Sequence, residues 1–436
     1  MNTVTHHPSE KGQVLVLIVL AVVALLGFTA LAVDGGMVYS DRRQSQNSAD
    51  ASSLGGGGKA ALVMDNSSVA YWNWNCSNSA VINSGNQGRT VAALRAGDNG
   101  FVLAADDSDL SDLQGIDVRC TNLDTSSFWP EKYMDFEVQL TRDTPPSFGQ
   151  FIFSGPLRNS VVAVTRIRPR SNLAFGNAIV ALNPATHCNT VNLSAGFHGT
   201  TDIVLNGGGI FSNGCIVAKD AALTVEVHQA GVMYGTELNL HDSGTIALDP
   251  GYTISKTPEQ LPPSHFALDA EPDCAHAAAH NYTADQFEAD VFDGGLSPGL
   301  YCVDGNVEFN GGDYVAGIGV TIVLRSGKFT VNGGANIQLY APQPDAPPPA
   351  IPGLLFYGPA GYTGPVKLNG NETSVYQGTI LFPTAGVEFE GTGGNAGLLS
   401  SQIIGWDVKI GGNSSVLIDY KGEEQYSRPP YIELYR

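Results

Sequence analysis

A five-residue pattern recurs through the second half of the chain, with apolar residues at its first and third positions and glycine at its fifth. Its copies are Val307–Gly311, Phe329–Gly333, Val366–Gly370, Val387–Gly391 and Val408–Gly412. Positions 307 and 329 are 22 residues apart, and positions 366, 387 and 408 are 21 apart. Upstream, Ile203–Gly207 is followed 22 residues later by the similar segment Val225–Val227. Strands of fixed length at a period of roughly 20–29 residues indicate the stacked coils of a solenoid.

A second set of apolar segments fits the same coils: Val320–Leu324, Leu354–Tyr357, Thr379–Phe382 and Gln402–Ile404. Glycine accounts for 52 of 436 residues, about 12% where roughly 7% is usual, and glycine supplies the turn conformations that coil corners need. No helical periodicity separates the repeats. We therefore expect residues 171–436 to form a right-handed parallel β-helix with insertions at 249–297 and 341–353.

The outward positions of the predicted coils carry alternating charge. Lys367, Glu388 and Lys409 occupy the same repeat position, and adjacent parallel strands lie ~4.8 Å apart. These side chains are therefore expected to form a ladder of opposite charges. A second outward row is expected to stack in the same way: Asn310, Asn332 and Asn369. We interpret both rows as surface packing and turn stabilisation.

Near the start of the chain, Val14–Val33 is an apolar run of twenty residues without a charge. At ~1.5 Å per helical residue, the run spans the ~30 Å hydrocarbon core of a bilayer. A cleaved signal peptide is the competing interpretation, because Ala30-Leu31-Ala32 has the small-x-small form of a cleavage site. The run is longer than the ~7–15 residues of a typical signal core. We therefore favour a retained single-pass anchor, with the lipid bilayer as the partner of Val14–Val33.

The topology of this anchor is not fixed by the charges beside it. Lys11 precedes the run, while Arg42 and Arg43 follow it together with Asp34 and Asp41. The six cysteines lack a CxxC pair, which favours disulfides over a zinc or thioredoxin-like site. Disulfides form in exported proteins. We therefore expect a cytoplasmic-membrane protein whose C-terminal body is extracellular or periplasmic.

Six cysteines allow fifteen disulfide connectivities. The sequence alone leaves them open. We prefer sequential pairing because each pair then falls within one predicted segment: Cys76 with Cys120, Cys188 with Cys215, and Cys274 with Cys302.

The residues around the apolar run resemble the N-terminal segment of TadG-like Flp pilus-assembly proteins. The matching elements are Glu10–Gln13 before the run, then Asp34–Tyr39, the pair Arg42-Arg43, and Gln46–Ala51. The resemblance covers about residues 10–58 and implies a single-span protein of the tight-adherence pilus system. Pilus subunits or the pilus-assembly machinery would then be its partners. The sequence departs from the pattern at Gly55–Gly58, which is expected to fray the helix.

Residues 59–170 predict a small α+β segment. Arg89–Arg95 suggests a short helix, and Asp135–Leu140 alternates polar and apolar residues as a half-buried strand does. Ser160–Ile167 is rich in β-branched residues and predicts a second strand. These strands flank a Pro-Phe loop, an arrangement that is also similar to the TadG-like body. We expect a pilin-like architecture in which a long N-terminal helix, starting in the anchor segment 1–58, lies on a small antiparallel sheet.

The last repeats, within Gly378–Tyr420, resemble the β-helical domain of PilX-like, pilus-related surface proteins. The matching motifs are Gly378–Pro383, Ala385–Val387 and Gly411–Asn413. The resemblance implies a surface or adhesive role and carries no catalytic residues.

Charge and motif content exclude several function classes. The chain carries 22 Lys+Arg against 42 Asp+Glu, a net charge of −20, which argues against a nucleic-acid partner. No Walker A, GxGxxG or HExxH motif is present. The one G-x-S-x-G match, Gly295–Gly299, places Pro298 after Ser297. A proline has no N–H to stabilise an oxyanion, so we interpret this segment as a turn.

One cluster has the residue types of a metal site. His276 and His280 would share a face if a helix ran from about Asp273 to Val291, with Asp273 as a third ligand. We favour a surface helix on a solenoid insertion, with Cys274 in a disulfide. No catalytic, cofactor-binding or metal-ligating residue is assigned.

These observations favour a membrane-anchored, surface-exposed structural or adhesive protein that is associated with Flp/Tad-type pilus assembly. Its rigid solenoid would contact pilus subunits or surface carbohydrate. A membrane-displayed or secreted β-helix enzyme acting on carbohydrate is the alternative, although no cluster of carboxylates with a base is evident. In a third interpretation, the chain is an internal assembly factor whose solenoid is only a spacer.

Overall fold

The computed structural model describes residues 13–111, 113–124, 130–151, 155–186, 188, 194–200, 202–220, 223–241, 244–391, 398–412 and 415–435. Glu10–Gly12 and Asn413, which contribute to the resemblances above, lie outside these residues. The described chain forms two compact units. The helical unit holds the residues up to Arg170 together with 430–435, and the parallel-sheet unit is Ser171–Pro429. The second unit is therefore an insertion within the first, which corrects the predicted boundary at residue 436.

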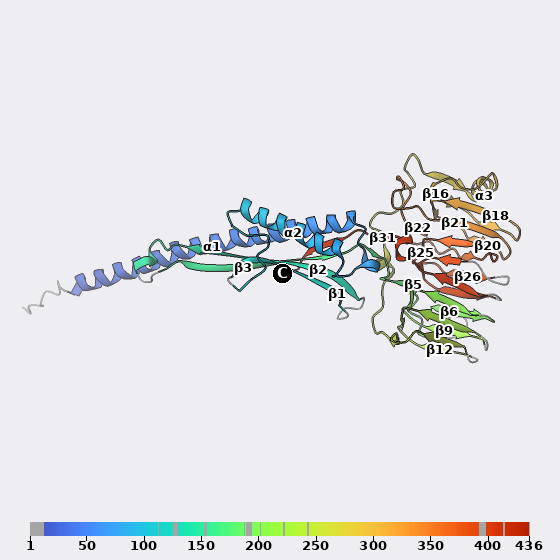
Figure 1. Cartoon of the computed structure of the whole chain (residues 1–436), viewed down its shortest axis with the longest axis horizontal. Coiled ribbons are helices and arrows are strands. Elements are labelled where there is room, and N and C mark those ends of the chain that lie inside the picture. The colour runs from blue at the N-terminus through green and yellow to red at the C-terminus, as the bar shows by residue number, and fades with distance from the viewer. Residues whose placement is uncertain are drawn as a thin grey trace, which may run out of the picture. The chain divides into compact units, whose positions relative to one another are not determined.

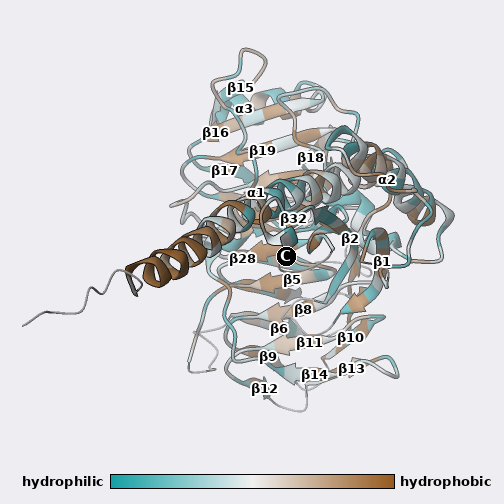
Figure 2. Cartoon of the chain, turned by 90° about the vertical axis from the view of Figure 1, so that its left-hand side faces the viewer, coloured by the Kyte–Doolittle hydropathy of each residue, from teal (hydrophilic) through white to brown (hydrophobic). Residues whose placement is uncertain are grey.

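The helical unit is built around one long helix, α1 (Gln13–Asn66). No proline interrupts this stretch, so the intrahelical hydrogen bonds can continue through it. Its first half is apolar, as the brown segment in Figure 2 shows, and its side chains are almost all exposed. Within the described residues α1 is the one helix long and apolar enough to cross a membrane.

The second helix, α2 (Ser79–Asp98), packs against α1 and is longer than the predicted Arg89–Arg95. The side chain of Asn78 caps it by accepting the N–H of Ala80. Gly55–Gly58 lie inside α1, so the expectation of a frayed helix is wrong. Packing explains the difference, because glycines let the two helices and the sheet approach closely.

A four-stranded antiparallel sheet completes the helical unit, in the order β1-β2-β3-β32. The strands are β1 (Gly115–Asp124), β2 (Glu131–Thr144), β3 (Leu157–Arg168) and β32 (Tyr431–Leu434). α1 packs on β2 and β3, as expected for a long helix on an antiparallel sheet. The last strand comes from the end of the chain, because Arg168 of β3 lies opposite Tyr431 of β32. β3 would otherwise be an exposed edge.

Three parallel sheets make up most of the second unit, and Figure 1 shows their strands stacked one above another. The ten-stranded sheet runs in the order β14 (Ile254–Lys256), β11 (Val232–Tyr234), β8 (Gly209–Ser212), β5 (Asn177–Ala181), β28 (Ile403–Gly405), β25 (Thr379–Phe382), β22 (Leu354–Tyr357), β19 (Val320–Leu324), β16 (Gly299–Asp304), β15 (His280–Thr283). A short antiparallel pair, β4 (Ser171–Asn172) with β31 (Ser427–Arg428), joins the two ends of the unit.

The other two parallel sheets each have eight described strands. We call one of them the ladder sheet, because it contains Lys367, Glu388 and Lys409 of the predicted charge ladder. It runs in the order β12 (Leu238–Leu240), β9 (Ile216–Lys219), β6 (Ala195–Gly199), β29 (Val408–Gly412), β26 (Val387–Gly391), β23 (Val366–Leu368), β20 (Phe329–Val331), β17 (Val307–Phe309). The third sheet runs in the order β13 (Thr245–Leu248), β10 (Thr224–His228), β7 (Ile203–Asn206), β30 (Val416–Asp419), β27 (Leu398–Ser400), β24 (Val375–Gln377), β21 (Asn336–Tyr340), β18 (Tyr314–Ile318).

The predicted repeats occupy equivalent places in these sheets. All five copies between Val307 and Gly412 contribute strands of the ladder sheet, and the second apolar set contributes strands of the ten-stranded sheet. Inward-facing residues of the three sheets form one continuous apolar core, in which Phe309, Phe329 and Phe389 are fully buried. The recurring apolar positions are therefore the core-facing positions of strands that pair side by side in the parallel sheets.

The coils are not stacked in sequence order. β5 lies in the middle of the ten-stranded sheet, between β8 and β28. From β5 the chain adds strands in one direction until it reaches β14 at one end of the sheet. It then crosses to β15 at the opposite end and returns towards the middle. There β28, β29 and β30 pair with β5, β6 and β7, respectively. The predicted insertion at 249–297 is the connection that makes this order possible, because it contains both end strands.

The return segment, residues 257–279, is attached along its length. Asn213 accepts the N–H of Leu261 and donates to its carbonyl, at 2.8 and 2.7 Å. Arg428 donates to the carbonyls of His265 and Ala267. Further along, Tyr357 donates to Glu271 and Cys274 is bonded to Cys302. These contacts hold the return segment against several strands of the unit.

A short helix follows the return segment and occupies only the second half of the helix predicted from about Asp273 to Val291. α3 is Ala284–Phe292, and it begins at a capping box in which Thr283 and Gln286 bond reciprocally. Phe287 points from α3 into the core against Tyr301, Phe309 and Phe329, so α3 covers the end of the coil stack at which β15 and β17 lie.

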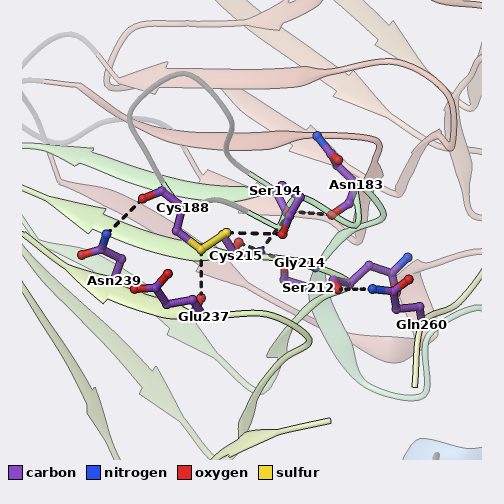
Figure 3. The surroundings of a disulfide bond; sticks show 11 residues. Asn183, Cys188, Ser194, Ser212, Gly214, Cys215, Glu237, Asn239 and Gln260 are labelled. Carbon is purple, nitrogen blue, oxygen red and sulfur yellow. Dashed lines mark hydrogen bonds between the residues drawn. A yellow bond between two sulfur atoms is a disulfide. The ribbon is translucent and has the colours of Figure 1, made fainter. Parts of the chain in front are cut away.

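The three disulfides follow the sequential pairing preferred from the sequence: Cys76–Cys120, Cys188–Cys215 and Cys274–Cys302. Figure 3 shows the surroundings of the second. Asn239 donates to the carbonyl of Cys188, and the hydroxyl of Ser194 accepts the N–H of Cys215, at 3.1 Å each. The disulfide thus attaches Cys188 to Cys215, the residue directly before β9.

Candidate functional site

The polar segment that follows the apolar run begins with a buried carboxylate. Asp34, one residue beyond Val33, is only 5% exposed. Its Oδ1 accepts the N–H of Ser147 at 2.8 Å, and its two oxygens also accept the N–H groups of Phe148 and Gly149. These donors belong to the Pro-Phe loop between β2 and β3. α1 is therefore fastened to the sheet at the point where it leaves the predicted membrane span.

The electrostatics of Asp34 reflect these contacts. Burial raises the pKa of its carboxyl, but the backbone N–H groups of Gly149, Ser147 and Phe148 outweigh burial and leave the pKa below its ordinary value. The contribution of Asp34 to stability is therefore present above the unfolded-state pKa of ~3.9. It is lost as the pH falls through the lower pKa of the folded state.

We expect Asp34→Asn to loosen this attachment without unfolding the unit. An amide offers one oxygen where the carboxylate offers two, and its NH₂ group would face backbone donors. The amide protons of Ser147–Gly149 should exchange roughly tenfold faster or more, measured by hydrogen–deuterium exchange of the full chain in detergent micelles. Asp50→Asn is the matched control, because Asp50 accepts from Gln46 of its own helix. Equal exchange in the two variants would contradict this role.

The next turns of α1 continue the attachment. Asp41 accepts the hydroxyl of Thr144 at 2.6 Å and lies 3.8 Å from the guanidinium of Arg142. Arg142 also donates to Gln44 at 2.8 Å. Two turns later, Ser53 accepts the hydroxyl of Thr165 on β3. The polar residues of α1 in this region thus dock the helix onto β2 and β3.

The far side of the sheet holds a buried ion pair that involves the end of the chain. The Arg166 guanidinium donates two parallel hydrogen bonds to Asp135, at 2.8 and 2.9 Å. It also lies between the rings of Tyr133 and Tyr435, 3.7 and 3.9 Å from their centroids. Hydrogen bonding to Asp135 outweighs burial and raises the pKa of Arg166. The C-terminal residues are therefore part of the helical unit's polar core.

The exposed face of the ladder sheet carries the predicted charges in the predicted register. Lys367 lies opposite Glu388, and Glu388 lies opposite Lys409. The ion pairs differ from the prediction, because Lys367 contacts both Glu388 and Glu390, at 2.8 and 2.7 Å. Among the described residues Lys409 has no ion pair. Burial raises the pKa of Glu390, but hydrogen bonds from Lys367 and His198 outweigh it and lower the pKa overall.

The predicted asparagine row is only partly present. Asn332 donates to Asn310 at 3.0 Å, as stacking requires. Asn369 is buried and instead accepts the N–H of Glu390. The neighbouring charges, Lys328 and Glu308, form an ion pair at 3.0 Å that lowers the pKa of Glu308.

The candidate metal cluster does not come together. His276 lies in a turn, where its Nδ1 accepts the N–H of Ala278, and Asp273 accepts the N–H of Ala275. His280 lies on β15 and stacks on Tyr301 at 4.6 Å. The expectation of one helix from Asp273 to Val291 is therefore wrong, because local turns and a strand occupy its first half. In the described part of the chain, no group of three His, Cys, Asp or Glu side chains could hold a metal ion.

The G-x-S-x-G match also has a structural explanation. Leu296 bridges to Gly317 of the neighbouring coil, and the carbonyl of Ser297 accepts the hydroxyl of Tyr301 at 2.8 Å. These residues connect α3 to β16, which agrees with the interpretation as a turn.

Sequence reasoning missed the roles of Asp34 and of the C-terminal residues. A signal for Asp34 was present, because a carboxylate directly after an apolar span must find donors wherever it is buried. No local signal exists for Tyr435, whose partners are more than 260 residues away in the chain (435 − 166 = 269).

Residues 12–61 match the model of a family described as putative Flp pilus-assembly TadE/G-like. No curated protein matches the chain. Among solved structures, the competence-associated pilin ComZ from Thermus thermophilus is similar over 70% of this chain and 83% of that chain, at 9% identity and a TM-score of 0.22. That TM-score is too low to support an argument. Most of α1 is therefore similar to a family described by pilus assembly, and the resemblance of residues 378–420 to PilX-like proteins stays a prediction.

Proposed function

We propose that the chain is a structural component of an Flp/Tad-type pilus system, anchored in the cytoplasmic membrane by Val14–Val33, that displays a right-handed parallel β-helix outside the membrane. One observation carries the proposal. α1 runs without a break through the apolar run and the rest of the matched segment, and Asp34 fastens it to the sheet directly after that run. A pull on the sheet would thus be transmitted to the membrane-spanning helix.

Three disulfides support export of both units. The handedness of the coils follows from the strong preference for right-handed connections between parallel strands of one sheet. Such a stack presents a long rigid surface, because each coil is supported by its neighbours. We therefore assign an adhesive role to the β-helix and an anchoring role to the helical unit, in contact with pilus subunits or the assembly machinery.

The insertion of one unit in the other allows a clean test. Arg168 and Tyr431 are paired neighbours in the antiparallel sheet, so a short hairpin can replace the β-helix. In the hairpin variant, Gly-Asn-Gly joins Arg170 to Pro430 and Ser171–Pro429 is absent. Its fold is checked by the Cys76–Cys120 disulfide, seen as a mobility shift on reduction.

The host cells are compared with the gene deleted, intact, or replaced by the hairpin variant. We expect the deletion to remove both pili and adhesion, and the hairpin variant to restore pili, counted by electron microscopy, without restoring adhesion. Pili that are unaffected by the deletion would contradict the pilus association. Pili that fail to return with a folded hairpin variant would contradict the division of roles and favour an assembly function for the β-helix.

A further inference from the structure

The exposed face of the ladder sheet has a hollow over its middle strands. The hollow has a volume of about 270 Å³ and is lined by residues of β9, β6, β29 and β26. One glycine of the hollow stands where the neighbouring strands carry side chains. Gly196 lies in register between Val217 and Lys409. The missing side chain at Gly196 leaves space beside the charged row.

The carboxylates of the hollow already have partners. Glu388 and Glu390 both bind Lys367, and Glu390 also lies 3.4 Å from Nε2 of His198. Asp220 accepts the N–H of Gly199 at 2.8 Å. Each carboxylate still has oxygen lone pairs with which it can accept hydroxyl protons.

The two ammonium groups of the hollow have no such partners. In the described part of the chain, neither Lys219 nor Lys409 forms an ion pair or a side-chain hydrogen bond, and Lys409 is half-buried. The charge of Lys409 favours the ionised form of the Asp407 carboxyl, but among the described residues no carboxylate lies within ion-pair distance of its ammonium. Cations without an ion pair are unexpected on a chain with a net charge of −20, in which carboxylates outnumber cations 42 to 22. The hollow therefore combines two available cations with an array of hydroxyl acceptors.

We propose that this hollow binds an acidic sugar, a carboxylated saccharide unit of the uronic acid type. The sugar carboxylate pairs with Lys409 and Lys219, and the ring hydroxyls donate to the carboxylates of Glu388 and Glu390. The ring lies over Gly196, where the absence of a Cβ allows close approach of the backbone. This inference rests on the adhesive role proposed above and names the ligand class of that role.

Binding is measured by isothermal titration of the full chain in detergent micelles with short oligomers of galacturonic acid. Neutral galactose oligomers of the same length and inorganic sulfate are the comparison probes. We expect saturable binding of the acidic oligomers that weakens with salt. Removing the two cations in the Lys219→Gln, Lys409→Gln double variant should weaken binding at least tenfold, because each ammonium makes a charged hydrogen bond.

Lys328→Gln is the matched control, because it removes the same charge from the same sheet at a distance from the hollow. It should leave binding unchanged, and Lys409→Arg should retain most of it. No binding of acidic oligomers to the intact chain, or equal binding by the double variant and the intact chain, would overturn the proposal. Competition by sulfate at equal concentration would show a simple anion site and would also overturn it.

The binding measurement uses the purified chain, so its result does not depend on whether the cells make pili. A failure of the proposed function would appear as unaffected pili in the gene deletion, whatever the purified chain binds. A failure of the present inference would appear as absent binding, whatever happens to the pili.

Discussion

Replacing Gly88 by alanine is expected to lower the thermal midpoint of the helical unit by about 5 °C, although alanine is the better helix former. A Cβ on Gly88 would lie 2.3 Å from Cζ of Phe136 and 2.8 Å from the carbonyl oxygen of Gly56. Phe136 is fully buried and the oxygen belongs to the backbone of α1, so neither can retreat. Overpacking of this kind costs about 1–3 kcal/mol, and each kcal/mol shifts the midpoint by about 2–4 °C in a unit of this size.

Gly58→Ala is the matched control for this prediction. It lies in the glycine run of α1, but an added Cβ would meet nothing within 4 Å. Alanine should then stabilise the helix by about 0.5–1 kcal/mol, the ordinary difference in propensity. The thermal midpoint is measured by circular dichroism at the helix band. Hydrogen–deuterium exchange of the β2 peptides identifies which unit unfolds at that temperature. Effects of the same sign for the two variants would contradict the packing role of the glycines.

Removing the last seven residues, Pro430–Arg436, is expected to have the second large effect. The sheet loses β32, the buried Arg166 guanidinium loses the ring of Tyr435, and Arg168 loses its ion pair with Glu433. β3 becomes an exposed edge with unpaired backbone groups. A cation–π contact, an ion pair and four strand pairings are lost together. We therefore expect the free energy of unfolding of the helical unit to fall by at least about 3 kcal/mol, which is a large part of the stability of an ordinary domain.

The measurement is the amount of chain that survives brief trypsin treatment of solubilised membranes. The shortened chain should be cut within Met1–Arg170 at least tenfold faster than the intact chain. Tyr431→Ala is the control, since this side chain is 57% exposed and its loss leaves the strand pairings in place. Equal resistance of the shortened and intact chains would show that β32 is dispensable.

Periodic features of the fold could be predicted from the sequence because they are local. Inward and outward positions alternate within each strand, so Val366-Lys367-Leu368 and Val387-Glu388-Phe389 carry the core and the surface pattern side by side. The order of the coils could not be predicted, because the pattern is the same whichever coils are neighbours. The pairing of β5 with β28 joins residues more than 220 positions apart (403 − 179 = 224), and only the structure shows it.

Two errors have a common physical cause. The glycine run in α1 was interpreted from helix propensity, which tertiary packing overrides. Asp273–Val291 was interpreted from helical spacing alone, whereas the Cys274–Cys302 disulfide and the pairing of β15 with β16 determine its backbone. In the candidate site, register placed Lys367, Glu388 and Lys409 correctly. The space beside Lys409 depends on Gly196 of the neighbouring strand β6, which no single repeat reveals.

The central claim is that the chain stays in the membrane through α1 and displays its body outside the cell. The most direct test treats intact cells with protease and follows the chain by mass spectrometry of the membrane and soluble fractions. The account predicts an uncut N-terminal apolar run in the membrane, and protease-released fragments that carry the disulfides of the body. A soluble chain that begins at Val33, or a membrane-bound chain that protease reaches only after lysis, would contradict it.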